Sequence, residues 1–159
     1  DFIGTNGING GHYDIEKIIK IIRKLWEPTI KEEPYIVCTG GEPLLQLDQD
    51  FVDNVHLAGF KIGIETNGTK IPPKNIDWIC VSPKKNSKII LLEGDELKFV
   101  YPQSDFDPLQ FEKLNFNFFF IQPMDNNKYN ENKMMTENFI KKNPSWRLSL
   151  QTHKILGFP

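Results

Sequence analysis

Cysteine is scarce in this sequence. The 159 residues contain two cysteines, Cys38 and Cys80, and each lies inside a short apolar run. Two isolated cysteines exclude the dense disulfide framework of a small secreted domain, and neither belongs to a C-x-x-C pattern that would predict a metal site. We therefore interpret Cys38 as a packed core residue rather than a ligand.

Long apolar runs and an excess of charge are also missing. No stretch approaches the roughly 18 consecutive apolar residues of a membrane span. The formal net charge is −2, which gives no electrostatic case for nucleic acid as a direct partner. No internal repeat or linker is evident, so we expect residues 1–159 to form a single domain of a cytoplasmic protein, with no membrane association.

What is present is an alternation of strand and helix patterns. Apolar residues recur at helical spacing from Ile15 to Trp26 after a predicted N-cap at Asp14. Short apolar, β-branched or aromatic runs predict six strands, at residues 35–38, 61–64, 78–81, 97–101, 118–121 and 146–150. Further helices are predicted at about 49–58, 108–114 and 130–142. This order predicts an α/β fold with a mainly parallel sheet.

Polar residues gather where these predicted strands end. In a parallel sheet the carboxyl ends of the strands share one edge, and ligand sites are built there. Five of the six strands end this way, which predicts a ligand site at that edge. The polar clusters are Thr39/Glu42, Glu65/Thr66/Asn67, Ser82/Lys84, Gln122/Asp125 and Gln151/His153.

The first of these strand ends, Thr39-Gly40-Gly41-Glu42-Pro43, has the most distinctive chemistry. Two adjacent glycines remove side chains, so that a ligand can approach the bare peptide groups closely. Glu42 adds a carboxylate, which suits an amine or a ribose hydroxyl rather than a phosphate. By itself the motif is equally compatible with a ligand site and with an ordinary turn that happens to contain an acidic residue.

Six motifs in a fixed order resemble one known family. They are CTGGEPLL, IETNGT, VSPK, LKFVYP, FIQPMD and QTHK, and the likeness extends from DFIGTNG to the closing proline. The strand followed by GGEP resembles the amine-binding turn of radical S-adenosylmethionine (SAM) enzymes. The order of motifs resembles the 7-carboxy-7-deazaguanine synthase family, which serves the pathway to queuosine and related deazapurines.

The resemblance implies an enzyme and assigns roles to residues. The implied reaction is a radical SAM lyase reaction that converts 6-carboxy-5,6,7,8-tetrahydropterin to 7-carboxy-7-deazaguanine with loss of ammonia. The implied cofactors are S-adenosylmethionine, a [4Fe–4S] cluster and Mg²⁺. The implied SAM-binding residues include Thr39, with Gly40, Gly41 and Glu42 at the methionyl amine and Glu65 at the ribose. The others are Ser82 and Lys84 at the methionine carboxylate or ribose, and Gln122, Met124 and Asp125 at the adenosyl group. The implied substrate residues are Asn6, Gly7, Gln151, His153 and the terminal Pro159.

The sequence departs from the family in one respect. The family holds its cluster through three cysteines just upstream of the D-F-x-G segment, followed by a threonine for Mg²⁺, and this sequence begins at Asp1. We expect the first strand and the cluster loop to lie upstream of Asp1. Two other readings stay open: a cluster-free SAM-binding protein, and a radical SAM activase that acts on a protein partner.

The resemblance also implies the architecture and the partners. It implies a partial (β/α) barrel of the radical SAM type with fewer helices than a full barrel. An incomplete barrel leaves edges and apolar surface for a second subunit to cover, so we expect a homodimer. An electron donor such as flavodoxin or ferredoxin is implied as a further partner.

Overall fold

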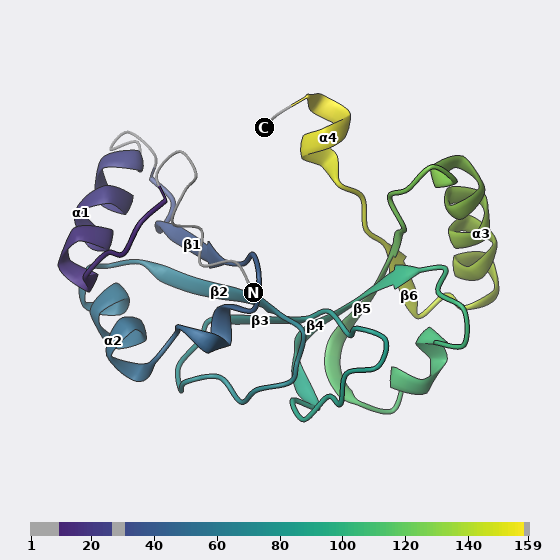
Figure 1. Ribbon diagram of the computed structural model, residues 1–159, viewed down its shortest axis with the longest axis horizontal. Coiled ribbons are helices and arrows are strands. Elements are labelled where there is room, and N and C mark those ends of the chain that lie inside the picture. Colours follow the sequence, from purple (N-terminus) through teal and green to yellow (C-terminus); the bar gives the residue numbers. More distant parts are fainter. Residues whose placement is uncertain (1–9, 27–30, 158–159) are drawn as a thin grey trace. The chain divides into compact units, whose positions relative to one another are not determined.

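The computed structural model describes residues 10–26 and 31–157 of the chain. These residues divide into two units of helices and parallel strands (Figure 1). Unit 1 extends to Thr66 and also includes residues 70–79, whereas unit 2 consists of residues 67–69 and of the chain from Cys80 onward.

The two helices of unit 1 begin at aspartate caps. The helix α1 (Ile15–Leu25) follows Asp14, whose carboxylate accepts a 2.8 Å hydrogen bond from the Lys17 amide. The helix α2 (Gln49–Leu57) follows Asp48, which accepts an equal bond from the Phe51 amide. These bonds satisfy amide groups that have no partner within the helix. Both predicted helices are confirmed within one residue at each end.

The two strands of unit 1 are parallel. They are β1 (Tyr35–Cys38) and β2 (Lys61–Thr66), and Cys38 lies opposite Ile64 in the ladder. A short 3₁₀ helix, η1 (Pro43–Leu45), follows the turn after β1. Because the strands run in the same direction, the residues that end them meet at one edge.

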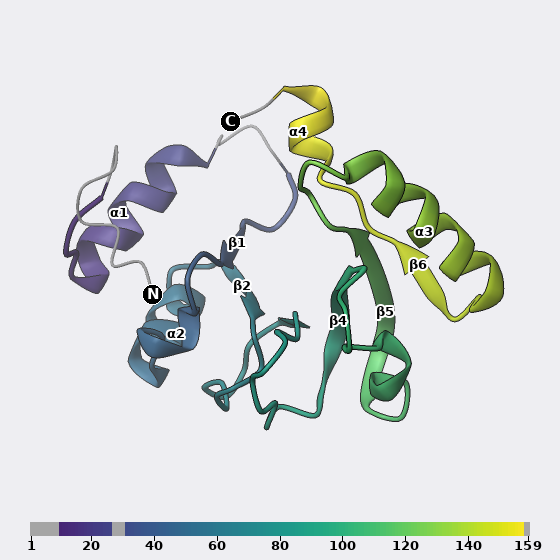
Figure 2. The same cartoon turned by 45° about the vertical axis from the view of Figure 1, so that its right-hand side comes forward.

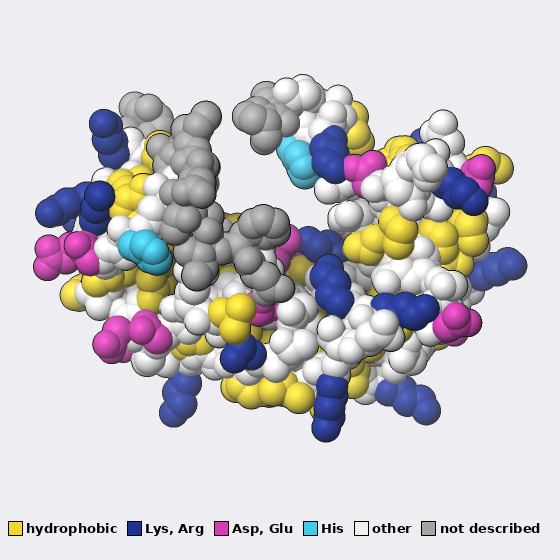
Figure 3. All heavy atoms as spheres, in the orientation of Figure 1, with side chains coloured by type: hydrophobic (Ala, Val, Ile, Leu, Met, Phe, Trp, Pro, Cys, Tyr) yellow, Lys and Arg dark blue, Asp and Glu magenta, His cyan; other side chains and the backbone are white. Residues whose placement is uncertain are grey.

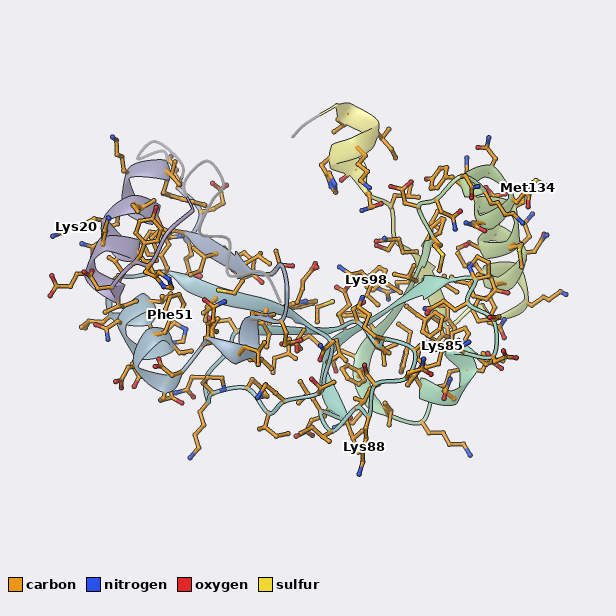
Figure 4. All side chains as sticks on the ribbon, in the orientation of Figure 1. Lys20, Phe51, Lys85, Lys88, Lys98 and Met134 are labelled. Carbon is orange, nitrogen blue, oxygen red and sulfur yellow. The ribbon has the colours of Figure 1, made fainter. Side chains whose placement is uncertain are left out.

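A small apolar core fixes these strand ends. Val52 and Val55 of α2 and Ile62 of β2 are fully buried, and Phe60, just before β2, is buried with them. Half-buried side chains of α1 and α2 pack around them, among them Phe51 (Figure 4). Burying each of the four buried core side chains contributes about 1.5–3 kcal/mol. This burial holds the helices on the strands.

Unit 2 is a parallel sheet with the strands in chain order. It contains the last two residues of β3 (Trp78–Val81), followed by β4 (Glu93–Tyr101), β5 (Asn115–Pro123) and β6 (Trp146–Leu148). The β4–β5 register extends from Glu93 opposite Asn115 to Tyr101 opposite Pro123. Both strands therefore begin earlier than predicted, by four and three residues.

Helix α3 (Tyr129–Lys142) covers β5 and β6 (Figure 2). The core of this unit is aromatic: Phe99 packs on Phe111 with ring centroids 5.9 Å apart, and the buried Trp146 lies 5.4 Å from Phe119. The Trp146 indole donates a 2.7 Å hydrogen bond to Glu112, so its one polar atom is satisfied.

Two predicted elements of unit 2 need correction. The predicted helix at 108–114 is the short 3₁₀ helix η2 (Pro108–Phe111). The predicted last strand at 146–150 ends at Leu148, and residues 152–156 form a helix, α4 (Thr152–Leu156), that the sequence analysis did not predict. Five residues are too few for a hydrophobic period to reveal a helix. The strands of both units are parallel, and helices lie between most of them along the chain, so the predicted α/β class is confirmed.

Candidate functional site

The turn after β1 presents bare backbone. Thr39, Gly40 and Gly41 are exposed, and the two glycines have φ values of 79° and 57°. Such left-handed backbone favours glycine. A Cβ atom built on Gly40 would meet no atom of the described residues within 4 Å. As far as residues 10–26 and 31–157 show, the turn therefore leaves space in which a ligand can approach the peptide groups.

Glu42 follows the glycines but is buried. Its carboxylate oxygen Oε1 accepts a 3.1 Å hydrogen bond from the Leu44 amide and a 2.6 Å bond from the Thr66 hydroxyl. These bonds begin η1 and join it to the end of β2. The structure thus gives Glu42 a structural task that the sequence analysis missed, whereas its role at a ligand amine stays a prediction.

The parallel register brings Thr39 next to Glu65. The Thr39 hydroxyl lies 3.5 Å from Glu65 Oε2, at the long limit for a hydrogen bond. Glu65 is half-buried at the end of β2, beside the glycine turn. An acceptor-only carboxylate next to open peptide groups can receive the hydroxyls of a sugar.

Asn67 and Gly68 of the IETNGT motif begin unit 2 and form a tight turn. Gly68 has a φ of 77°, and a Cβ atom there would lie 2.8 Å from Val81. Its carbonyl accepts bonds from the amides of Ile90 and Leu91, at 2.9 and 3.1 Å. Asn67 accepts a 2.9 Å bond from the Thr69 amide. The asparagine and the glycine of the IETNGT motif therefore have a structural role, which is to form this turn.

Ser82 and Lys84 lie together after β3. The Lys84 ammonium donates a 3.0 Å hydrogen bond to the Ser82 hydroxyl. Ser82 is half-buried and Lys84 is exposed, with the buried Pro83 between them. The arrangement presents a cation and a hydroxyl that can bind a carboxylate together.

The end of β5 and the helix α4 form a second polar group in unit 2. Asp125 makes an ion pair with Lys154 of α4. Figure 3 shows acidic and basic side chains next to one another at that helix. Asp125, Gln151 and Lys154 line a cavity of about 220 Å³ with Tyr129 and Ile155. The structure thus brings Asp125 and Gln151 to one cavity, with Gln151 at the start of α4 rather than at a strand end.

The remaining predicted residues are accounted for as follows. Gln122 is half-buried at the end of β5, Met124 is half-buried in the turn after it, and His153 is exposed on α4. Asn6, Gly7 and Pro159 lie outside the described residues.

Sequence reasoning also missed charged residues. Lys154 lies within the QTHK motif but had no assigned role. On β4, Glu96 and Lys98 are half-buried two residues apart, and so lie on the same face of the strand. Lys98 is labelled in Figure 4. Cys80 lies with its sulfur 3.5 Å from Glu96. The available signal was a lysine inside the apolar run predicted as a strand at residues 97–101.

The described residues do not fit an iron–sulfur cluster or a metal ion. Within residues 10–26 and 31–157, no group of three His, Cys, Asp or Glu side chains could hold a metal. Burial raises the pKa of the Cys38 thiol to about 11, so this thiol stays protonated at neutral pH. Cys80 is buried on β3. We therefore assign neither cysteine to a cluster.

No helix within the described part of the chain is long and apolar enough to cross a membrane.

Comparison with known proteins gives consistent results. The chain is similar to the 7-carboxy-7-deazaguanine synthases of Burkholderia multivorans (46% identity, 100% of this chain and 76% of the relative), Bradyrhizobium diazoefficiens (47%, 99% and 75%) and Bordetella pertussis (46%, 100% and 76%). No family model matches the chain.

A solved structure shows the same fold. The crystal structure of QueE from Escherichia coli matches with a TM-score of 0.65 and 23% identity, over 87% of this chain. The chain spans 64% of the length of that structure. At this identity the likeness establishes the fold alone.

Proposed function

The chain belongs to the 7-carboxy-7-deazaguanine synthase family, and we propose that it acts as the family's radical SAM lyase. It converts 6-carboxy-5,6,7,8-tetrahydropterin to 7-carboxy-7-deazaguanine with loss of ammonia, in the biosynthesis of queuosine precursors. The observation that carries this function is the 46% identity to the Burkholderia multivorans synthase over the whole of this chain.

We assign contacts with S-adenosylmethionine to residues of unit 1. The open turn of Gly40 and Gly41 offers peptide carbonyls to the methionyl amine, with Thr39 at the strand end and Glu42 holding the turn in shape. Glu65 receives the ribose hydroxyls. The adjacency of Thr39 and Glu65, 3.5 Å apart, supports placing both groups on one ligand.

We also assign cofactor and substrate contacts to residues of unit 2. Ser82 and Lys84, already joined by a 3.0 Å hydrogen bond, bind the methionine carboxylate or the ribose. Gln122, Met124 and Asp125 line the adenosyl group. Gln151 and His153 contact the pterin, and the proposal extends to Asn6, Gly7 and Pro159.

The family uses S-adenosylmethionine and an iron–sulfur cluster, which together supply the radical. Because the described residues do not fit a cluster, the tasks assigned to them are to bind and orient the cofactor and to exclude water from it. We include Mg²⁺ and an electron donor such as flavodoxin or ferredoxin in the proposal. We also propose a cytoplasmic homodimer, supported by exposed apolar side chains such as Leu25, 79% exposed, and Leu57, 86% exposed.

Iron and sulfide analysis followed by turnover tests this function. The full-length gene product, purified without oxygen and reconstituted, should contain about four irons per chain, as a [4Fe–4S] cluster requires. With S-adenosylmethionine and a reductant it should convert the pterin to the deazaguanine, detected by mass spectrometry. Cofactor binding without iron would instead identify a cluster-free binding protein. A loaded protein that turns over no small molecule but activates another protein would identify an activase.

A further inference from the structure

The helix α3 buries polar residues where a covering helix normally buries apolar ones. Its two buried residues are Asn132, 5% exposed, and Thr136, fully buried. Asparagine is a poor helix former, and burying an amide costs free energy unless it is hydrogen-bonded. A helix that only had to cover the sheet would bury an apolar residue at this position. The amide of Asn132 therefore has a specific task.

That task is to hold the turn after β5. Asn132 Nδ2 donates a 2.8 Å hydrogen bond to the Met124 carbonyl and a 2.9 Å bond to Asn126 Oδ1. Both partners are acceptors, so the amide nitrogen, and not its oxygen, must face the turn. Thr136 donates a 2.7 Å bond to the Asn132 carbonyl and so supports the helix beneath it.

The turn is held from its other side as well. The Met124 amide donates a 2.7 Å hydrogen bond to the Tyr101 carbonyl at the end of β4. Both polar groups of the Met124 backbone are thus bonded, one to the sheet and one to α3. Asn126 Oδ1 also accepts a 2.9 Å bond from the Lys128 amide. The shape of residues 124–128 is therefore fixed from outside, although most of them are exposed.

We propose that Asn132 is a positioning residue that fixes the turn after β5, and with it Gln122 and Asp125, in the shape that receives the adenosyl group of S-adenosylmethionine. The proposal rests on the proposed function, which places the adenosyl group at this turn. Asn132 acts through the Met124 carbonyl and not by touching the ligand.

The variant Asn132→Asp tests the proposal. It is isosteric, but it replaces the amide nitrogen by an oxygen that faces two acceptors, which repels the turn. We expect the dissociation constant for S-adenosylmethionine, measured by titration calorimetry on the reconstituted holoenzyme, to rise about tenfold. Hydrogen exchange of residues 124–128 should become faster. The variant Asn138→Asp, which makes the same change at an exposed position of α3, should alter neither quantity.

Two further variants separate positioning from stability. Thr136→Val removes a buried hydroxyl that bonds the helix's own carbonyl, so it should lower the melting temperature and leave the affinity unchanged. Asn126→Ala removes one acceptor at an exposed position and should raise the dissociation constant two- to fivefold. An unchanged affinity in both Asn132→Asp and Asn126→Ala would overturn the proposal, whatever their melting temperatures.

The wild-type protein distinguishes failure of this proposal from failure of the proposed function. A wild type that binds S-adenosylmethionine but does not convert the pterin would overturn the proposed function and leave the test of Asn132 intact. A wild type that does not bind S-adenosylmethionine would overturn the placement of the adenosyl group and with it this proposal.

Discussion

The buried carboxylate of Glu42 accepts a 2.6 Å hydrogen bond from the hydroxyl of Thr66. Glu42 belongs to the turn after β1 and Thr66 is the last residue of β2, so the bond joins two motifs 24 residues apart. This buried bond helps to hold the turn after β1 against the end of β2. The turn at Gly40 is therefore followed by a carboxylate that is only 6% exposed and is bonded to the end of β2.

Removing the Thr66 hydroxyl should destabilise the protein. In Thr66→Val the shape is kept, but the buried Glu42 carboxylate loses a donor, which costs about 1–3 kcal/mol. We expect the free energy of unfolding, measured by urea denaturation, to fall by that amount. Thr69→Val, at a half-buried threonine whose recorded bond is made by the backbone amide, should cost less than half as much. Equal costs for the two variants would contradict a special role for the Glu42–Thr66 bond.

Adding one methyl group at Gly40 should block ligand binding. Gly40→Ala places a Cβ atom in the open space of the turn and strains a residue with a φ of 79° by about 1–2 kcal/mol. Gly59 offers a matched control, because its φ is 86° and a Cβ atom there, like one at Gly40, would meet no atom within 4 Å in the described part of the chain. Both variants should lose similar stability, but Gly40→Ala alone should lose affinity for S-adenosylmethionine in calorimetry. A similar affinity in the two variants would contradict ligand approach at Gly40.

Asp77 should stabilise unit 1 in a pH-dependent way. Partial burial raises the pKa of its carboxyl, but hydrogen bonds from the Ile62 amide and from His56, both 2.8 Å long, outweigh the burial and lower the pKa below its ordinary 3.8. A lowered folded-state pKa means that the stabilisation is present above the unfolded-state pKa and disappears as the pH falls through the folded-state value.

Asp77→Asn tests this linkage. At pH 7 the variant should be less stable than the wild type by about 1–2 kcal/mol, since it weakens a charge-assisted bond to a backbone amide. The difference, measured by urea denaturation from pH 7 downward, should shrink below pH 4. Asp53→Asn, at an exposed aspartate of α2, should show little difference at either pH. A cost for Asp77→Asn that stays constant with pH would contradict the lowered pKa.

How far the sequence alone predicts this fold depends on the local pattern of each segment. The bounds of β3 agree with the prediction because Trp78 to Val81 is an apolar run between turn residues. The beginning of β4 was missed because Glu93, Gly94, Asp95 and Glu96 have no strand pattern of their own. They are extended because β5 pairs with them, and this is a tertiary effect that no local rule contains.

The candidate site, like the fold, could be predicted from the sequence only in part. The motifs and their order point to the strand ends, and the parallel register then brings Thr39 next to Glu65. The bonds made by Glu42 and Asn132 could not be read from the sequence. A glutamate beside glycines suggests a ligand contact, and an asparagine on a polar helix suggests a solvent-facing residue. Only the packing shows that both are buried and support the turns on which the proposed ligand contacts lie.

The last prediction concerns which end of S-adenosylmethionine meets Lys84. If Lys84 binds the methionine carboxylate, Lys84→Met should raise the dissociation constant for S-adenosylmethionine about tenfold through loss of a charge-assisted hydrogen bond. The same variant should bind 5′-methylthioadenosine as the wild type does, because that compound keeps the adenosyl group and lacks the carboxylate. Lys88→Met, at an exposed lysine further along the same loop (Figure 4), controls for the loss of positive charge. Equal weakening toward both compounds would place Lys84 at the ribose instead, and no effect on either would remove it from the site.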